Sequence, residues 1–412
     1  MTATGSASSR RSLDGGAVVV ATSVMNVATY GFTIIAARVI GPSEYGAFVA
    51  CLGLLLVAQV VAYGLQATAA RRIVVDATNV AAIERAILAL GLRVALGLGL
   101  VLGALVPVIT SLLRLDSPAT AVVLALAAVP LTIAGGQAGI LQGERRWGAL
   151  AIFYLAAGVP RLLVGTGLVL WRPDATTAFV GVALGLLFPL GVGFWALRHR
   201  RGTSQVVPEH SSSAMLVETA HNSQVLLAFF ALSSIDIVLA RQVLTGHEAG
   251  LYAAGLIMTK VMLFLPQFVV VVAFPDMASQ ESRRRALVTS LAVVATIGAL
   301  VVLAARVLSG VAMVFVGGSD FADVEDLLWV FALLGTLLAM LQLQVYAVLA
   351  RQGRRTVLLV WGALVVVALT GYRADSFVQL VSTVAAVDAA LLVVLTALSL
   401  RVARAPAAGP DA

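Results

Sequence analysis

The chain has 412 residues, of which 60% are apolar and only 11% are charged, and its mean hydropathy is +1.02. Soluble domains carry about 25% charged residues, so this composition excludes a soluble enzyme and makes the lipid bilayer the expected solvent. The single cysteine, Cys51, excludes a disulfide framework and a thiolate metal cluster. The chain has 27 basic and 20 acidic residues. In a membrane protein this excess of positive charge is explained first by topology, and we infer no nucleic-acid binding from it.

Twelve apolar runs have the length needed to cross a bilayer, which takes about 20 residues of helix. They fall near 16–36, 46–66, 87–108, 119–141, 149–170, 176–197, 221–240, 250–272, 286–307, 326–349, 356–371 and 376–399. Only short connections remain between them, with no room for a sizeable extramembrane domain. We therefore predict an all-α, polytopic membrane protein with about twelve transmembrane helices.

The basic residues between these runs indicate the orientation of the chain. With a cytoplasmic N-terminus, the cytoplasmic segments carry 18 Lys and Arg residues, and the opposite loops carry six, one in each. Every cytoplasmic segment carries more Lys and Arg residues than any outer loop, as the positive-inside rule requires. The pattern predicts that both termini are cytoplasmic.

Short motifs recur in the two halves of the chain. Residues 37–48 contain A-R followed by E-x-G-x-F, and residues 240–252 contain A-R followed by E-x-G-x-Y; Q-G-E-R-R at 142–146 is echoed by Q-G-R-R at 352–355. An even number of spans separates the copies, so both halves have the same orientation and a pseudo-two-fold axis would run along the membrane normal. We predict a tail (1–15), an N-terminal six-helix lobe (16–198), a cytoplasmic linker (199–220), a C-terminal six-helix lobe (221–400) and a second cytoplasmic tail (401–412).

Polar residues align on one face of the first, second, seventh and eighth spans. At 100° per residue, Asn26 and Tyr30 share a face of the first span, Gln59 and Gln66 share a face of the second, and Gln267 belongs to the stripe of the eighth. Such stripes commonly join packed helices. Their coincidence in equivalent spans of the two halves favours a shared polar cavity between the lobes.

Four ionisable residues lie deep in predicted spans: Arg161, Asp236, Lys260 and Asp388. Intramembrane charges either pair with each other or mark substrate and ion pathways. The first interpretation is two ion pairs, Asp236 with Lys260 and Arg161 with Asp388. The second is a cationic site for an anionic headgroup, formed by Arg161 and Lys260, with Asp236 or Asp388 binding a proton or a sodium ion.

No catalytic or metal-binding signature accompanies these residues. The four histidines lie in or beside loops, without H-E-x-x-H spacing. The longest outer loop is too short to build an active site. We expect no catalytic residues, no metal and no cofactor, and a transporter instead of an enzyme.

Residues 36–46 read AARVIGPSEYG, with the spacing A-R-x-x-G-P-x-x-Y-G. This segment resembles a motif of the bacterial polysaccharide flippases of the multidrug, oligosaccharidyl-lipid and polysaccharide exporter superfamily, a family that includes O-antigen and exopolysaccharide flippases. Segments 236–241, 249–254 and 274–275 are similar to the family's second-half elements in place and order. With the helix count and lobe symmetry, the resemblance extends over nearly the whole chain.

The resemblance implies a flippase for a polyprenyl-pyrophosphate-linked oligosaccharide, moved from the cytoplasmic to the outer leaflet of the cytoplasmic (inner) membrane for cell-surface polysaccharide assembly. Two lobes would alternate access to a cavity lined by the first, second, seventh and eighth spans. A polysaccharide polymerase and glycosyltransferases are the implied partners; we expect a monomer and no nucleic acid. The related peptidoglycan-precursor flippases carry two further helices and more charges where this chain has Asn26 and Tyr30, which argues against that subfamily.

Two alternatives remain open at this point. A cation-coupled multidrug exporter of the same superfamily would carry an amphipathic cation, against which the basic residues Arg161 and Lys260 count. A non-transporting scaffold of a polysaccharide-assembly complex would use the deep charges only as ion pairs. Lys260→Met would leave such a scaffold functional, whereas a headgroup-binding flippase would lose transport.

Overall fold

The computed structural model describes residues 4–198, 212–263, 283–316, 319–349 and 354–402. Within these ranges the regular secondary structure is entirely helical. Ten of the described helices are long and apolar enough to cross a membrane, and Val357–Gly371 is a shorter apolar segment. Within the described ranges each predicted span falls on one helix or, for the third, sixth and tenth spans, on two consecutive helices. The helix of the eighth span ends at Met262, and residues 264–272 lie outside the described ranges. The predicted all-α, polytopic membrane fold is confirmed.

The chain forms two compact units, Met1–Gln224 and Val225–Ala412. The first contains the beginning of α9 and the helices α1 (Thr4–Ile40), α2 (Pro42–Val75), α3 (Val80–Ala104), α4 (Val106–Leu112), α5 (Pro118–Gly143), α6 (Trp147–Trp171), α7 (Ala175–Gly185) and α8 (Leu187–Leu197). The second contains the remainder of α9 (Ser212–Val243) and the helices α10 (Gly246–Met262), α12 (Arg283–Val307), α13 (Ser309–Val316), η2 (Ser319–Leu327), α14 (Leu328–Leu349), α15 (Arg354–Gly371) and α16 (Phe377–Val402).

The two A-R motifs lie at the turns into the second and eighth spans, where local sequence sets the helix start. Gly41 precedes α2 with a φ of +75°, a left-handed conformation that glycine adopts without strain. Pro42 follows in the first turn, where its missing N–H costs nothing. At α10, Thr245 and Glu248 form a capping box, each side chain accepting a hydrogen bond from the other's backbone N–H.

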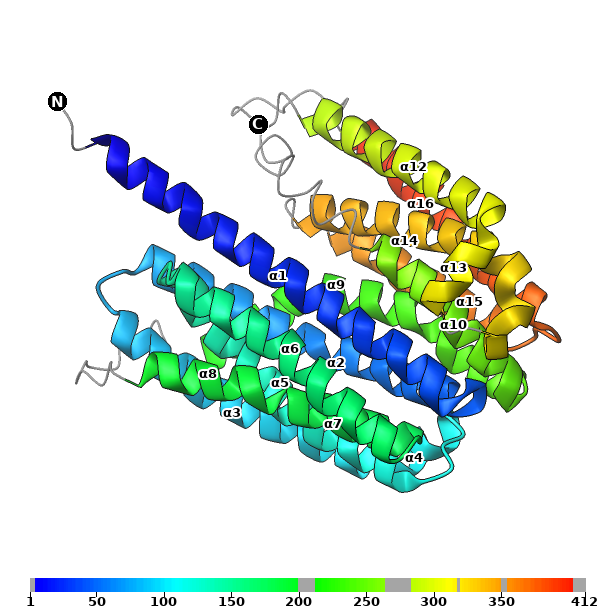
Figure 1. Ribbon diagram of the computed structural model, residues 1–412. Helices are drawn as coiled ribbons and strands as arrows, with labels where there is room; N and C mark the ends of the chain where they lie inside the picture. The colour runs from blue at the N-terminus through cyan, green and yellow to red at the C-terminus, as the bar shows by residue number, and fades with distance from the viewer. Residues whose placement is uncertain (1–3, 199–211, 264–282, 317–318, 350–353, 403–412) are drawn as a thin grey trace. The chain divides into compact units, whose positions relative to one another are not determined.

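Helix α5 packs against α2, α3, α7 and α8, and it forms the centre of the first unit (Figure 1). Glycines spaced four residues apart allow α2 to approach α5 closely. A Cβ atom at Gly135 would lie 2.6 Å from the Cα of Ala62, and one at Gly139 would lie 2.7 Å from the Cα of Gln66. Because helices in lipid associate through packing of small residues, these glycines determine how the second span meets the fourth.

Gly139→Ala is expected to lower the free energy of unfolding by about 2 kcal/mol, because the added methyl group would meet the backbone of α2. Thermal unfolding of the purified protein in detergent measures the effect. The matched control is Gly167→Ala on α6, where a Cβ would meet no heavy atom within 4 Å and the helix propensity of alanine is higher. An unchanged unfolding midpoint for Gly139→Ala would contradict the close approach of α2 and α5.

The internal packing of the two units supports the predicted repeat. Helix α5 packs on α2 and α3 as α14 packs on α10 and α12, and both third spans are followed by a short helix, α4 and α13. Phe48 of the first motif meets Phe179 on α7 edge-on, with ring centroids 6.2 Å apart. Tyr252 of the second motif meets Phe377 on α16 in the same way at 5.5 Å. The aromatic residue of each motif therefore joins the second to the sixth span of its unit. The pseudo-two-fold axis between the units stays a prediction.

Candidate functional site

Arg161 lies near the centre of α6, where α1 and α7 both approach closely. A Cβ atom on Gly158 would lie 2.5 Å from the Cα of Met25 in α1, and one on Gly185 of α7 would lie 2.9 Å from the Cα of Arg161. The guanidinium group lies over the ring of Phe32, with Cζ 5.9 Å from the ring centroid. Tight packing on two sides thus holds the charge in place.

Tyrosine and glutamine side chains from α1 and α2 complete a polar cluster around this charge. The hydroxyl of Tyr30 lies within electrostatic reach of the Arg161 guanidinium and of Tyr63. Gln59 donates a hydrogen bond to the hydroxyl of Tyr63 at 3.0 Å. We call Arg161, Tyr30, Tyr63 and Gln59 the arginine cluster; it brings together three of the predicted cavity residues, Arg161, Tyr30 and Gln59.

Within the described part of its own unit, Arg161 has no carboxylate partner. Its Nε atom is buried and has no hydrogen-bond partner among the described residues. A buried donor of a charged group is costly to leave without a partner, and an anionic ligand relieves this cost. Guanidinium N–H groups and phenol hydroxyls are donors that match phosphate oxygens, so the arginine cluster has the chemistry of an anion site.

The other predicted cavity residues have separate positions. Gln66 donates hydrogen bonds to Gln142 Oε1 at 3.0 Å and to Tyr154 Oη at 3.3 Å, and so links α2, α5 and α6. Asn26 lies half-buried on α1, one turn before Tyr30. Gln267 lies outside the described residues.

In the second unit, the three predicted charged residues converge from three helices. Asp236 is on α9, Lys260 on α10 and Asp388 on α16, and each interacts electrostatically with the other two. Both carboxylates are 1% exposed. The hydroxyl of Tyr252 lies within electrostatic reach of both. We call Asp236, Lys260, Asp388 and Tyr252 the carboxylate cluster.

Lys260 and the two carboxylates are neighbours without a direct salt bridge. Lys260 donates to the backbone carbonyl of Ser233, and neither carboxylate lies within 4.0 Å of its Nζ. Asp236 accepts a hydrogen bond from the backbone N–H of Ile237 at 2.8 Å, whereas both oxygens of Asp388 lack a hydrogen-bond partner among the described residues. The Asp236–Lys260 pair considered from the sequence is thus a longer-range interaction, and the pairing of Arg161 with Asp388, which would join the two units, stays a hypothesis.

The net charge of the carboxylate cluster follows from its composition. With both carboxylates and the ammonium ionised and the phenol of Tyr252 neutral, one negative charge is left in a buried site. A proton or a monovalent cation would neutralise it. No group of three or more His, Cys, Asp or Glu residues suited to a metal ion is found in the ranges that the structure describes.

Tyr63 and Tyr252 complete the two clusters but were not among the predicted site residues. The sequence carries a signal for each. Tyr63 follows Gln59 by four residues, which places both on one helical face. Tyr252 is the aromatic residue of the second E-x-G-x-aromatic motif. Both tyrosines therefore belong to the polar stripes of the second and eighth spans, from which the shared cavity is predicted.

Neither a protein-family model nor a curated protein matches the sequence. Solved structures do match in fold. An inward-facing multidrug resistance MATE family transporter of the MOP superfamily gives a TM-score of 0.72 at 13% identity over 93% of this chain and 94% of that one. Lipid II flippase MurJ in an inward closed conformation gives 0.70 at 10% identity over 93% and 87%. The MATE multidrug transporter DinF-BH gives 0.65 at 13% identity over 95% and 94%.

The chain therefore has the fold of the MOP superfamily transporters. It is an integral, multi-pass membrane protein with that fold. The matched structures include drug transporters and a lipid flippase, so the fold leaves the cargo open.

Proposed function

We propose that this protein is a flippase that moves a polyprenyl-pyrophosphate-linked oligosaccharide from the cytoplasmic to the outer leaflet, for assembly of a cell-surface polysaccharide. The fold, shared with lipid II flippase MurJ as well as with drug transporters, makes a lipid-linked cargo plausible. The motif at 36–46 supports the polysaccharide branch. The positive-inside count supports a cytoplasmic membrane location with both termini in the cytoplasm.

The observation that carries this proposal is the arginine cluster. A guanidinium without a carboxylate partner in the described part of its unit, beside Tyr30, favours an anionic headgroup over a cationic drug. Pyrophosphate and sugars cannot cross hydrocarbon unaided, whereas the polyprenyl tail remains soluble in lipid. The protein needs only to shield and bind the headgroup while the tail stays in the bilayer.

The membrane potential supplies part of the driving force. Each elementary charge is worth about 2.3 kcal/mol per 100 mV, and an inside-negative potential favours outward movement of an anion. The carboxylate cluster is the proposed site of ion coupling, with Asp236 or Asp388 taking a proton or a sodium ion. In this proposal the coupling ion replaces the Lys260 ammonium as the positive charge beside the carboxylates. The ammonium can then contribute to headgroup binding.

A second candidate is a cation-coupled multidrug exporter. The carboxylate cluster and the fold match to MATE family transporters favour it. Arg161 counts against it, because a cation without a carboxylate partner in the described part of its unit repels a cationic cargo. The two candidates differ in the cargo that accumulates when the protein is absent.

Depletion of the protein in its native cell tests the proposal. Polyprenyl-pyrophosphate-linked glycans are measured by mass spectrometry, with a leaflet-selective probe that modifies only externally accessible glycans. We expect a defined lipid-linked unit to accumulate on the cytoplasmic side, and re-expression of the wild-type protein to clear it. Unchanged glycan levels together with increased sensitivity to cationic dyes would contradict the flippase function and favour the drug exporter.

A further inference from the structure

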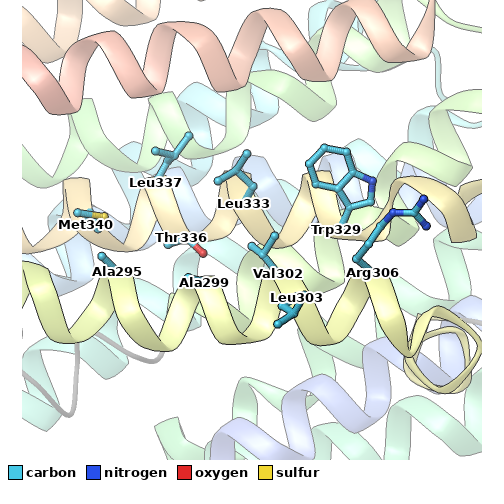
Figure 2. Close-up of a pocket in the computed structure, with 10 residues that line it drawn as sticks. All are labelled: Ala295, Ala299, Val302, Leu303, Arg306, Trp329, Leu333, Thr336, Leu337 and Met340. Atoms are coloured by element: carbon cyan, nitrogen blue, oxygen red, sulfur yellow. The ribbon is translucent and has the colours of Figure 1, made fainter.

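Helices α12 and α14 enclose a groove of about 570 Å³ inside the second unit (Figure 2). The helices are in contact at Gly298, where a Cβ would lie 2.6 Å from Thr336 Oγ1. The groove is lined by Ala295, Ala299, Val302, Leu303, Arg306, Trp329, Leu333, Thr336, Leu337 and Met340. Apart from Arg306, the polar lining atoms are few, and the Thr336 hydroxyl already donates to the carbonyl of Ala332 at 2.8 Å. The body of the groove is therefore suited to a hydrocarbon chain.

The length of the groove matches one leaflet of a bilayer. Along α12 it runs from Ala295 to Arg306, eleven helical steps of about 1.5 Å each, or about 17 Å. The hydrocarbon core of a bilayer is about 30 Å thick, so a single leaflet contributes about half of that. Leu303 is 60% exposed and Leu333 is 38% exposed, which places an open side of the groove toward the lipid. An acyl chain of a bilayer phospholipid fits this length.

The polar end of the groove is formed by Arg306 and Trp329, which lie beside each other at the end opposite Ala295 and Met340 (Figure 2). Arg306 is in the last turn of α12 and is exposed. Among the described residues it forms no ion pair, and the nearby Glu325 accepts a hydrogen bond from Ser309 Oγ at 2.8 Å. Tryptophan and arginine at a span end favour the headgroup level of a membrane. A guanidinium there matches a lipid phosphate in charge and geometry.

We propose that this groove binds a glycerophospholipid of the leaflet at the C-terminal end of α12, the outer leaflet in the predicted topology. One acyl chain lies between α12 and α14, and the phosphate accepts hydrogen bonds from Arg306. A polyprenyl chain of a lipid-linked sugar is much longer than one leaflet and would leave most of its length outside the groove. The site is separate from the arginine and carboxylate clusters and does not depend on the proposed function.

Native mass spectrometry of the purified full-length protein, titrated with phosphatidylglycerol, tests the proposal. The wild-type protein is expected to retain one lipid more tightly than any other. Arg306→Gln should weaken this binding about tenfold through loss of charge-assisted hydrogen bonds. Leu303→Trp should weaken it as strongly, because the indole ring fills the groove from its exposed rim without disturbing buried packing.

The matched controls are Arg373→Gln, an exposed arginine just after α15, and Leu369→Trp, a 59% exposed leucine in the last turn of α15. Both are expected to bind phosphatidylglycerol as the wild type does. The proposal is overturned if the groove variants also bind it as tightly as the wild type. It is equally overturned if Leu303→Trp blocks binding of a polyprenyl phosphate and leaves phosphatidylglycerol binding intact, which would assign the groove to the tail of the cargo.

Discussion

Arg161→Gln is expected to lower transport of the lipid-linked oligosaccharide at least about thirtyfold. Glutamine keeps a hydrogen-bonding side chain but removes the charge that would bind the pyrophosphate. Losing hydrogen bonds to a charged group in a buried site costs about 2 kcal/mol or more, which corresponds to a factor of about 30. The measurement is the rate at which lipid-linked glycan reaches the outer leaflet, normalised to the amount of folded protein in the membrane.

The stability of the same variant separates binding from a structural role. Arg161 has no carboxylate partner within the described part of its unit, so its removal relieves an unpaired charge, and we expect the unfolding midpoint to stay the same or to rise. Arg172→Gln is the matched control at the end of the same helix, where the side chain is 73% exposed and pairs with Asp174 at 2.7 Å. It should leave transport and stability unchanged. If Arg161→Gln transports at the wild-type rate, the arginine cluster does not bind the cargo.

Lys260→Met is expected to lower the free energy of unfolding by about 2 kcal/mol, and adding Asp388→Asn should restore most of the loss. Removing the ammonium leaves two buried carboxylates within electrostatic reach of each other without a compensating charge. Neutralising one of them returns the cluster to a single negative charge. Thermal unfolding of the wild type, both single variants and the double variant in detergent gives the coupling energy between the two positions.

The double-variant cycle also bears on the role of Lys260. Lys260→Arg keeps the charge and is the matched control for the loss of charge in Lys260→Met. If Lys260→Met and Asp388→Asn act additively, the two residues do not interact, and the carboxylate cluster is not an electrostatic unit. If Lys260→Met loses transport even in the restored double variant, the ammonium has a function beyond balancing the carboxylates.

Sodium or proton binding to the carboxylate cluster gives a further readout in the same samples. A cation that binds the folded protein raises its unfolding midpoint by mass action. We expect sodium chloride or acidification to stabilise the wild type relative to choline chloride at equal ionic strength, and Asp388→Asn to remove this effect. Equal stabilisation of both proteins would place ion binding elsewhere.

Much of the fold could be predicted because its signals are local. The apolar runs follow from hydrophobicity, and within the described residues every predicted span falls on one helix or on two consecutive helices. The helix starts at Gly41 and Thr245 also follow from the residues themselves. The deep charges could be found for the same reason, because an ionisable residue stands out in an apolar run.

The sequence by itself determined that the protein lies in a membrane, where its helices run, and which residues are candidates for function. Only the tertiary structure decided which of those residues meet. Tyr30 and Arg161 come from α1 and α6, and Asp236 and Asp388 come from α9 and α16. Their proximity depends on close helix contacts, such as Gly158 against α1, that no property of one segment specifies. Hydropathy is a property of each residue, whereas a binding site is a property of packing between residues far apart in the chain.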